Sequence, residues 1–240
     1  MEMMRLDKLL AHSGVGTRKE VKTYIRKGWV LVNQEVVKKD DFKVNPDIDE
    51  IICNDELIKY QKYIYLMLNK PAGYICANKD NVHPTVLELI DDYYNYQLFP
   101  VGRLDIDTEG LLIISNDGDF AHKLLAPSRK HSKLYYTKVE GVINQRDVDL
   151  FKQGISIDTG YKCMPSNMKL IKIDGNISEV EIEIFEGKFH QVKKMIEAVD
   201  KKVIYLKRIK IRSLCLDEDL KLGKYRELTT YELVDLMDNL

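Results

Sequence analysis

The apolar positions near the start of the chain recur with the period of a helix. Two stretches have apolar residues three and four positions apart: Leu6, Leu9 and Leu10, and then Val21, Tyr24 and Ile25. Thr17 and Glu20 have the spacing of a capping box at the start of the second stretch, and Gly28 follows its end. Apolar residues also flank the turn Asn33-Gln34. The pattern predicts two helices followed by a small hairpin.

From about Tyr63 onward, the alternation typical of strands is interspersed with helical spacing. Residues 180–184 alternate between apolar residues and glutamates, which predicts a half-buried strand. Residues 190–199 have helical spacing, and residues 203–211 again predict a strand. Because no regular β-α-β repeat occurs, the pattern favours an α+β fold over a doubly wound sheet.

The composition is that of a soluble globular protein. Hydrophobic residues make up 45% and charged residues 31% of the 240 residues. The N-terminus is charged, and the longest apolar stretches, residues 64–68 and 111–114, are shorter than the ~20 residues of a membrane span. The four cysteines are scattered, with no Cys-x-x-Cys pair. We therefore expect a cytoplasmic protein that has no secretory signal, contacts no membrane and binds no metal.

Charge is unevenly distributed, although the formal net charge is only -1. Basic residues gather within residues 5–27, acidic residues follow within 40–56, and a second basic stretch covers 188–212. If the apolar stripe of the second helix is buried, its basic residues lie on or beside the exposed face. Such a patch can bind phosphates, but on charge alone an ordinary solvated helix explains it equally well.

A resemblance gives the N-terminal segment a function. Residues 4–39, which include RKEVKTYIRKGWVLVNQ, resemble the alpha-L RNA-binding module first known from small-subunit ribosomal protein four. In that family the second helix and the hairpin present the RNA-binding surface. The resemblance implies an RNA-binding domain over residues 1–60 and a second domain over residues 61–240. It also implies RNA contacts from five basic residues: Arg5, Arg18, Lys19, Lys22 and Arg26.

The densest group of candidate catalytic residues lies in PVGRLDIDTEGLLIISNDG, residues 100–118. Its hydrophobic pattern predicts a turn entering a buried strand. Several carboxylates accompany the turn: Asp105, Asp107, Glu109 and Asp117. From the residues alone, they could form an acid–base pair, hold Mg²⁺, or simply cap helices and turns.

The same segment resembles the catalytic motif of the RNA pseudouridine synthases, in the branch that includes the small-subunit enzyme. In that family the aspartate of the Arg-Leu-Asp triplet is catalytic, and it matches Asp105; the preceding arginine matches Arg103 and holds the target nucleotide out of the stack. Further segments match in order over residues 68–90, 133–141 and 186–199. They imply a catalytic Tyr135 and Lys193, and substrate contacts from Lys70, His190 and Gln191. Tyr136 leaves open which tyrosine faces the base.

The resemblance implies a mixed, largely antiparallel sheet with flanking helices, and the isomerisation of a uridine to pseudouridine in 16S ribosomal RNA (the uridine-516 type). The reaction detaches uracil from ribose and rejoins it through ring carbon five, so no cofactor is required. The enzyme flips the base out of the RNA. Asp105 then acts as a nucleophile or base, Tyr135 offers its ring to the uracil, and Lys193 compensates the carboxylate charge.

Three alternatives stay open at this point. A large-subunit synthase of the same branch differs mainly at Tyr74 and residues 83–86, which favour the small-subunit type. A non-catalytic RNA-binding assembly factor would be expected to lack Asp105. A metal-dependent nuclease would use Asp105, Asp107 and Asp117. We expect a monomer that acts on ribosomal RNA or a small-subunit assembly intermediate.

Overall fold

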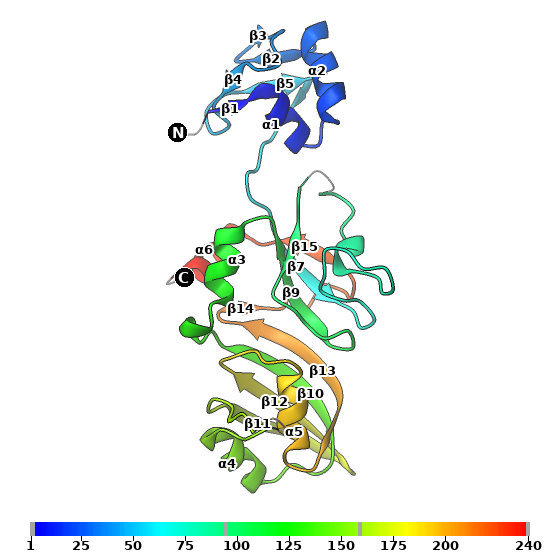
Figure 1. Cartoon of the computed structure of the whole chain (residues 1–240), viewed down its shortest axis with the longest axis vertical. Coiled ribbons are helices and arrows are strands. Elements are labelled where there is room, and N and C mark those ends of the chain that lie inside the picture. Colours follow the sequence, from blue (N-terminus) through cyan, green and yellow to red (C-terminus); the bar gives the residue numbers. More distant parts are fainter. Residues whose placement is uncertain (1–2, 94–95, 158–159, 239–240) are drawn as a thin grey trace. The chain divides into compact units, whose positions relative to one another are not determined.

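The computed structural model describes residues 3–93, 96–157 and 160–238. The chain divides into two compact units, one formed by Met1–Ile64 with Ile90–Gln97 and the other by Tyr65–Leu89 with Leu98–Leu240 (Figure 1). Each unit is described by itself below. None of the helices in the described part of the chain is both long and apolar enough to cross a membrane.

The first unit contains the predicted pair of helices and hairpin. Its elements are β1 (Met4–Arg5), α1 (Leu6–His12), α2 (Arg18–Lys27), β2 (Val30–Val32), β3 (Glu35–Val36), β4 (Lys43–Val44), β5 (Ile51–Cys53) and β6 (Glu56–Leu57). Four strands form a sheet in the order β3-β2-β5-β6, and β1 pairs with β4. Leu6, Leu9, Leu10, Val21 and Ile25 are fully buried in its core, as their spacing predicted.

Local hydrogen bonds explain where α2 begins and ends. The Glu20 amide donates to Thr17 Oγ1 at 3.3 Å, and the Thr17 amide donates to Glu20 Oε2 at 2.8 Å, so both halves of the capping box are present. Gly28 ends the helix with φ +79°, a left-handed conformation that glycine adopts at little cost. Asn33 and Gln34 also have positive φ and turn the chain between β2 and β3.

The second unit is built on one large sheet. Its elements are β7 (Tyr65–Lys70), β8 (Phe99–Val101), β9 (Glu109–Ser115), α3 (Gly118–Leu125), β10 (Lys133–Glu140), α4 (Gln145–Gln153), β11 (Asn167–Asp174), β12 (Ile177–Ile184), α5 (Gln191–Glu197), β13 (Lys202–Ile211), β14 (Leu214–Cys215), β15 (Tyr225–Glu227) and α6 (Thr230–Met237), with short 3-10 turns at Val86–Leu89 and Pro127–Arg129. The nine-stranded sheet has the order β11-β12-β10-β13-β9-β7-β15, with β14 beside β13 and β8 beside β9. These elements confirm the α+β prediction.

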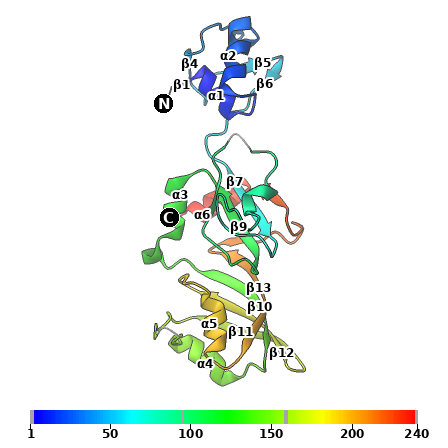
Figure 2. The ribbon, with the colours of Figure 1, turned by 45° about the vertical axis from the view of Figure 1, so that its right-hand side comes forward.

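Helices pack on this sheet in two groups, which both ribbon views show (Figures 1 and 2). α4 contacts β11 and α5 contacts β13. α3 and α6 supply Phe120, Leu124 and Leu236 to a core that includes Leu111 and Ile113 of β9. Burial of these side chains removes apolar surface from water and fixes the helices against the sheet.

One pairing sets the position of the candidate site. All described strand pairs are antiparallel except β13 with β9, which are parallel and match Lys207 with Glu109 and Arg208 with Gly110. Gly110 has φ +98°, and a Cβ atom there would lie 2.2 Å from the Arg208 carbonyl oxygen. Glycine therefore allows the two backbones to approach, which brings the loop before β9 close to β13 and its neighbour β10.

Candidate active site

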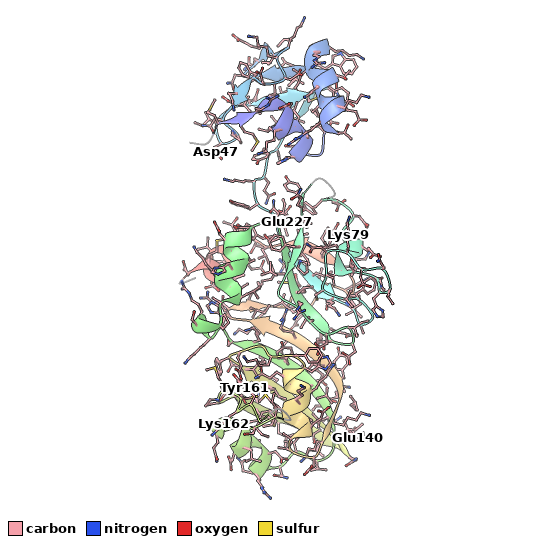
Figure 3. All side chains as sticks on the ribbon, in the orientation of Figure 1. Asp47, Lys79, Glu140, Tyr161, Lys162 and Glu227 are labelled. Carbon is pink, nitrogen blue, oxygen red and sulfur yellow. The ribbon has the colours of Figure 1, made fainter. Side chains whose placement is uncertain are left out.

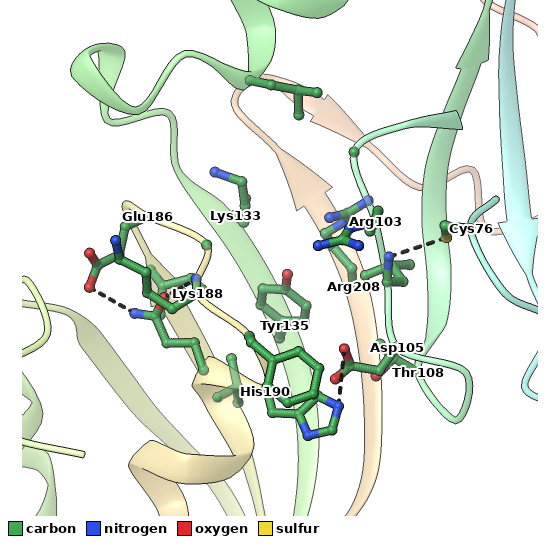
Figure 4. A pocket seen from close by; sticks show the side chains of 18 of the residues that line it. Cys76, Arg103, Asp105, Thr108, Lys133, Tyr135, Glu186, Lys188, His190 and Arg208 are labelled. Carbon is green, nitrogen blue, oxygen red and sulfur yellow. Dashed lines mark hydrogen bonds and ion pairs between the residues drawn. The ribbon is translucent and has the colours of Figure 1, made fainter. Parts of the chain in front are cut away.

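The second unit contains a cavity of about 1050 Å³, lined by segments that are far apart in the sequence (Figure 4). The loop between β8 and β9 contributes Arg103 and Asp105, β10 contributes Tyr135, and the segment before α5 contributes His190. Register explains the meeting of these segments, because Tyr135 pairs with Arg208 of β13 and Arg208 pairs with Gly110 of β9. A cavity of this size can enclose a nucleotide.

Asp105 lies at the cavity wall between two basic side chains. Its Oδ2 is 3.3 Å from Lys193 Nζ, and its Oδ1 is 3.7 Å from His190 Nε2. The carboxylate is 26% exposed, so it remains accessible to a ligand. Dashed lines in Figure 4 mark the contact with His190. The arrangement presents a carboxylate with compensating positive charge on one side and open cavity on the other.

Lys193 is shared between two carboxylates of the same loop. Its Nζ lies 2.6 Å from Asp107 Oδ1, closer than it lies to Asp105. Burial lowers the pKa of Lys193, but its hydrogen bond and charge interactions with Asp107 and Asp105 outweigh this and raise it overall. Burial likewise opposes the ionisation of Asp107, yet Lys193 holds the pKa of Asp107 below its usual value. Lys193 is therefore a permanent cation beside Asp105.

The structure separates the two adjacent tyrosines of β10. Tyr135 is 7% exposed and lines the cavity. Tyr136 donates its hydroxyl hydrogen bond to Glu179 Oε2 at 2.6 Å, and burial together with Glu179 raises its pKa to about 12. Successive side chains of a strand point to opposite faces, so only one of the two can face the cavity. Tyr135 is therefore the tyrosine of this pair that lines the cavity.

Lys70 does not lie where a substrate-binding lysine would be expected. It is fully buried at the end of β7, and its Nζ donates to backbone carbonyl oxygens of Pro71 (3.1 Å), Asp105 (3.0 Å), Ile106 (3.3 Å) and Thr108 (2.7 Å). An ammonium has three protons, and these carbonyls use all of them. The prediction of a substrate contact is therefore corrected: Lys70 holds the loop that carries Asp105.

Gln191 lines the cavity, and its side-chain amide also makes hydrogen bonds within the fold. Its Oε1 accepts a hydrogen bond from the Lys188 amide at 2.8 Å, and its Nε2 donates to Glu186 Oε1 at 3.0 Å. The side chain is 4% exposed. Both ends of the amide therefore hold the segment before α5 in place, and its contact with a substrate stays a prediction. His190 lines the same cavity, with φ +53° and its ring 3.8 Å from that of Phe189.

Several polar residues that line the cavity were not identified from the sequence as site residues, among them Cys76, Lys133 and Arg208. Cys76 accepts a hydrogen bond at Sγ from the Leu104 amide at 3.2 Å, and burial raises the pKa of its thiol. Lys133 and Arg208 line the same cavity. The position of Lys133 two residues before Tyr135 was the available signal, whereas Arg208 was hidden in a long basic stretch.

The five basic residues predicted to bind RNA fall into two groups. Arg5 and Lys22 lie 2.9 Å and 3.8 Å from Asp7, and Arg26 lies 2.6 Å from Asp40. Arg18 and Lys19 are exposed on the first turn of α2 and form no ion pair among the described residues. These last two are the most available for phosphates.

The three-carboxylate nuclease site is not formed. Asp117 accepts a hydrogen bond from the Tyr65 hydroxyl at 2.6 Å and from the Phe120 amide at 3.1 Å. It is 8% exposed and caps α3. Its carboxylate is therefore committed to the fold, which removes one of the three ligands that this alternative needs.

Comparisons with known proteins cover nearly all of the chain. The family described as RNA pseudouridylate synthase matches residues 64–198, and the S4 domain matches residues 4–47. An uncharacterized RNA pseudouridine synthase, YtzG, of Bacillus subtilis is 41% identical over 96% of this chain and 97% of its own. Proteins named ribosomal small subunit pseudouridine synthase A are 36% identical in Yersinia pestis, over 97% of this chain and 98% of theirs, and 34% in Escherichia coli, over 98% and 100%. A crystal structure of a pseudouridylate synthase is similar with a TM-score of 0.67 and 34% identity, covering 97% of this chain and 99% of that one.

Proposed function

This chain belongs to the RNA pseudouridylate synthase family, and on that premise we propose that it isomerises one uridine of 16S ribosomal RNA, of the position-516 type. The relatives named as small-subunit enzymes align over both units of the chain, which supports that target. The observation that carries the proposal is the position of Asp105, which lies 3.3 Å from Lys193 and lines a nucleotide-sized cavity together with Tyr135.

In the proposed reaction, Asp105 acts on the ribose of the target uridine. The bond between uracil nitrogen and the anomeric carbon breaks, and the anomeric carbon bonds to ring carbon five. Carbon five then loses its proton and the freed ring nitrogen gains one, so atoms and electrons balance without an outside reagent. Asp105 serves as the nucleophile at the anomeric carbon or as the base on the neighbouring sugar carbon. Lys193 stabilises the ionised carboxylate when the base displaces water from the cavity.

The base must leave the RNA stack before it reaches Asp105, at a cost of a few kcal/mol. Arg103 is exposed at the mouth of the cavity and can take the vacated place in the stack. Tyr135 supplies a flat, buried ring on which the uracil can rest. His190 lies within reach of both Asp105 and the entering nucleotide. These groups together make the cavity complementary to a flipped nucleotide.

We further propose that residues 1–60 position the ribosomal RNA and that residues 61–240 carry out the chemistry. Arg18 and Lys19 would contact phosphates first, while Arg5, Lys22 and Arg26 would do so by exchanging their acidic partners for RNA. We propose that the protein acts as a cytoplasmic monomer on ribosomal RNA or on a small-subunit assembly intermediate.

The test is a map of pseudouridines in ribosomal RNA from cells with and without this protein. We expect one modification to disappear from 16S RNA and to return with the wild-type gene and with Asp119→Asn, a control at an exposed aspartate. Asp105→Asn, which is nearly isosteric but neither a comparable nucleophile nor a base, should not restore it. A lost modification in 23S RNA would support the large-subunit alternative, and restoration by Asp105→Asn would overturn the role of Asp105.

A further inference from the structure

Two of the cations that line the cavity, Lys133 and Arg208, are at least partly buried and have no acidic partner among the described residues. Lys133 begins β10, and Arg208 lies on β13 directly beside Tyr135. In the view of Figure 4, Lys133 and Asp105 appear on either side of Tyr135. Lys133 Nζ donates to the His131 carbonyl at 2.9 Å, and Arg208 Nε donates to the Leu111 carbonyl at 2.8 Å. Among the residues that the structure describes, neither forms an ion pair with a carboxylate.

Burial makes this arrangement costly without a further ligand. Arg208 is 4% exposed, and its Nη2 is enclosed with no hydrogen-bond partner in the described part of the chain. Burial and the neighbouring Arg208 lower the pKa of Lys133 to about 8. Buried charges in proteins are ordinarily paired, and removing an ion from water without a partner costs several kcal/mol. The cavity therefore has an excess of positive charge at this wall.

Glu186 favours the charged form of Lys133 through its field, but among the described residues it forms an ion pair with neither cation. Its oxygens accept hydrogen bonds from other groups: Oε2 accepts from the Tyr161 hydroxyl at 2.6 Å, and Oε1 accepts from the Met164 amide at 2.9 Å and from Gln191. Tyr161 is among the residues labelled in Figure 3. Glu186 is thus held by Tyr161, Met164 and Gln191.

We propose that Lys133 and Arg208 form an anion subsite that receives a phosphodiester group next to the flipped uridine. This inference rests on the proposed function, because it takes RNA as the ligand. Lys133 makes the contact, and Arg208 acts through it by adding positive potential from the enclosed side. A phosphodiester carries one full negative charge and attracts unpaired cations, whereas the carbonyls of uracil are neutral. The subsite would anchor the nucleotide backbone while Asp105 acts on the sugar.

If this subsite exists, Lys133→Met should weaken RNA binding without lowering the stability of the protein. Removing a partly buried, unpaired charge should leave the melting temperature unchanged or raise it. RNA binding should weaken by about tenfold to a hundredfold, the range for one charge-assisted hydrogen bond. The slope of log affinity against log salt should become shallower by about 0.7 to 0.9, as for one lost phosphate contact. A purely structural lysine would show the reverse: lower stability and an unchanged slope.

The experiment uses the full-length protein and a 16S RNA fragment that contains the mapped uridine. Wild type, Lys133→Met and Lys133→Arg are compared with Lys138→Met, a control on the same strand whose lysine is 43% exposed and lies 3.7 Å from Glu179. Melting temperature, affinity against salt and single-turnover rate at saturating RNA are measured for each. We expect Lys133→Arg to keep the wild-type salt slope, Lys133→Met to have a slope that is shallower by about 0.7 to 0.9, and Lys138→Met to match wild type.

A second series of RNAs identifies the phosphate group that Lys133 contacts. A single neutral methylphosphonate replaces each phosphate around the uridine in turn. One position should weaken binding to wild type as much as Lys133→Met does, and it should have no further effect on that variant. The phosphate subsite is wrong if the loss of affinity at every methylphosphonate position adds fully to the loss caused by Lys133→Met. It is also wrong if Lys133→Met has the wild-type dependence of affinity on salt. Failure of wild type to modify the RNA would instead count against the proposed function, since the subsite is tested by binding.

Discussion

Replacing Lys70 with methionine would test whether the loop of Asp105 depends on a buried ammonium group. The Lys70→Met change keeps most of the side-chain volume but removes every hydrogen bond to the carbonyls of residues 71, 105, 106 and 108. Three of these bonds can form fully at once, and each is worth about 1.5 to 3 kcal/mol because the donor is charged. Removal of the buried charge recovers several kcal/mol of desolvation. We expect a net loss of about 3 kcal/mol in the free energy of unfolding.

Lys70→Met should lower both the melting temperature and the single-turnover rate. For a unit of this size, about 3 kcal/mol corresponds to a fall of roughly 6 to 12 °C in melting temperature. The single-turnover rate should fall about a hundredfold, because a displacement of ~1 Å at a catalytic group is enough for such a loss. RNA affinity should stay within about twofold of wild type, because Lys70 is fully buried beneath the loop.

The assay combines thermal unfolding, RNA affinity and single-turnover kinetics at saturating RNA. Lys79→Met is the matched control, because Lys79 is exposed in the same unit (Figure 3). A Lys70→Met protein with normal melting temperature and rate but weaker RNA binding would refute the proposal that Lys70 holds the loop of Asp105. That result would instead support the substrate contact that the sequence predicted for Lys70.

Three further predictions concern charge. Lys193→Met should lower the single-turnover rate about a hundredfold by removing the cation beside the catalytic carboxylate, whereas Lys194→Met should leave the rate nearly unchanged. Equal rates for the two variants would exclude Lys193 as the cationic partner of Asp105. Arg18→Ser should make the salt dependence of RNA affinity shallower by about 0.7 to 0.9, and an unchanged slope would mean that Arg18 touches no phosphate. Arg226 lowers the pKa of Glu232 from 4.5 to about 2, so this pair stabilises the fold above pH 4.5 and ceases to do so as pH falls towards 2. After a discount for the partial exposure of this pair, Glu232→Gln should lower the free energy of unfolding by about 2 kcal/mol at pH 7 and by little at pH 2, as measured by denaturant unfolding. An equal loss at both pH values would contradict the link between the pKa of Glu232 and stability.

Features that depend on neighbouring residues along the chain could be predicted from the sequence alone. The capping box of Thr17 and Glu20 joins residues three positions apart, and Gly28 ends the same helix through its own backbone conformation. The alternation before residue 184 predicted β12 because the strand period is local as well. Ordered motifs also led to Asp105 and Lys193, which the fold brings to 3.3 Å although the sequence separates them widely.

Which side chains face the cavity, and which of them hold other parts of the fold in place, depends on tertiary contacts. Lys70 and Gln191 belong to matching motifs, yet their polar atoms are consumed by the backbone and by neighbouring side chains. Arg208 becomes part of the site because Gly110 lets β9 run parallel to β13, a long-range pairing that no local pattern encodes. The physical reason is that periodicity and caps act over three or four residues, whereas burial and hydrogen-bond partners are fixed by segments that meet only when the sheet forms.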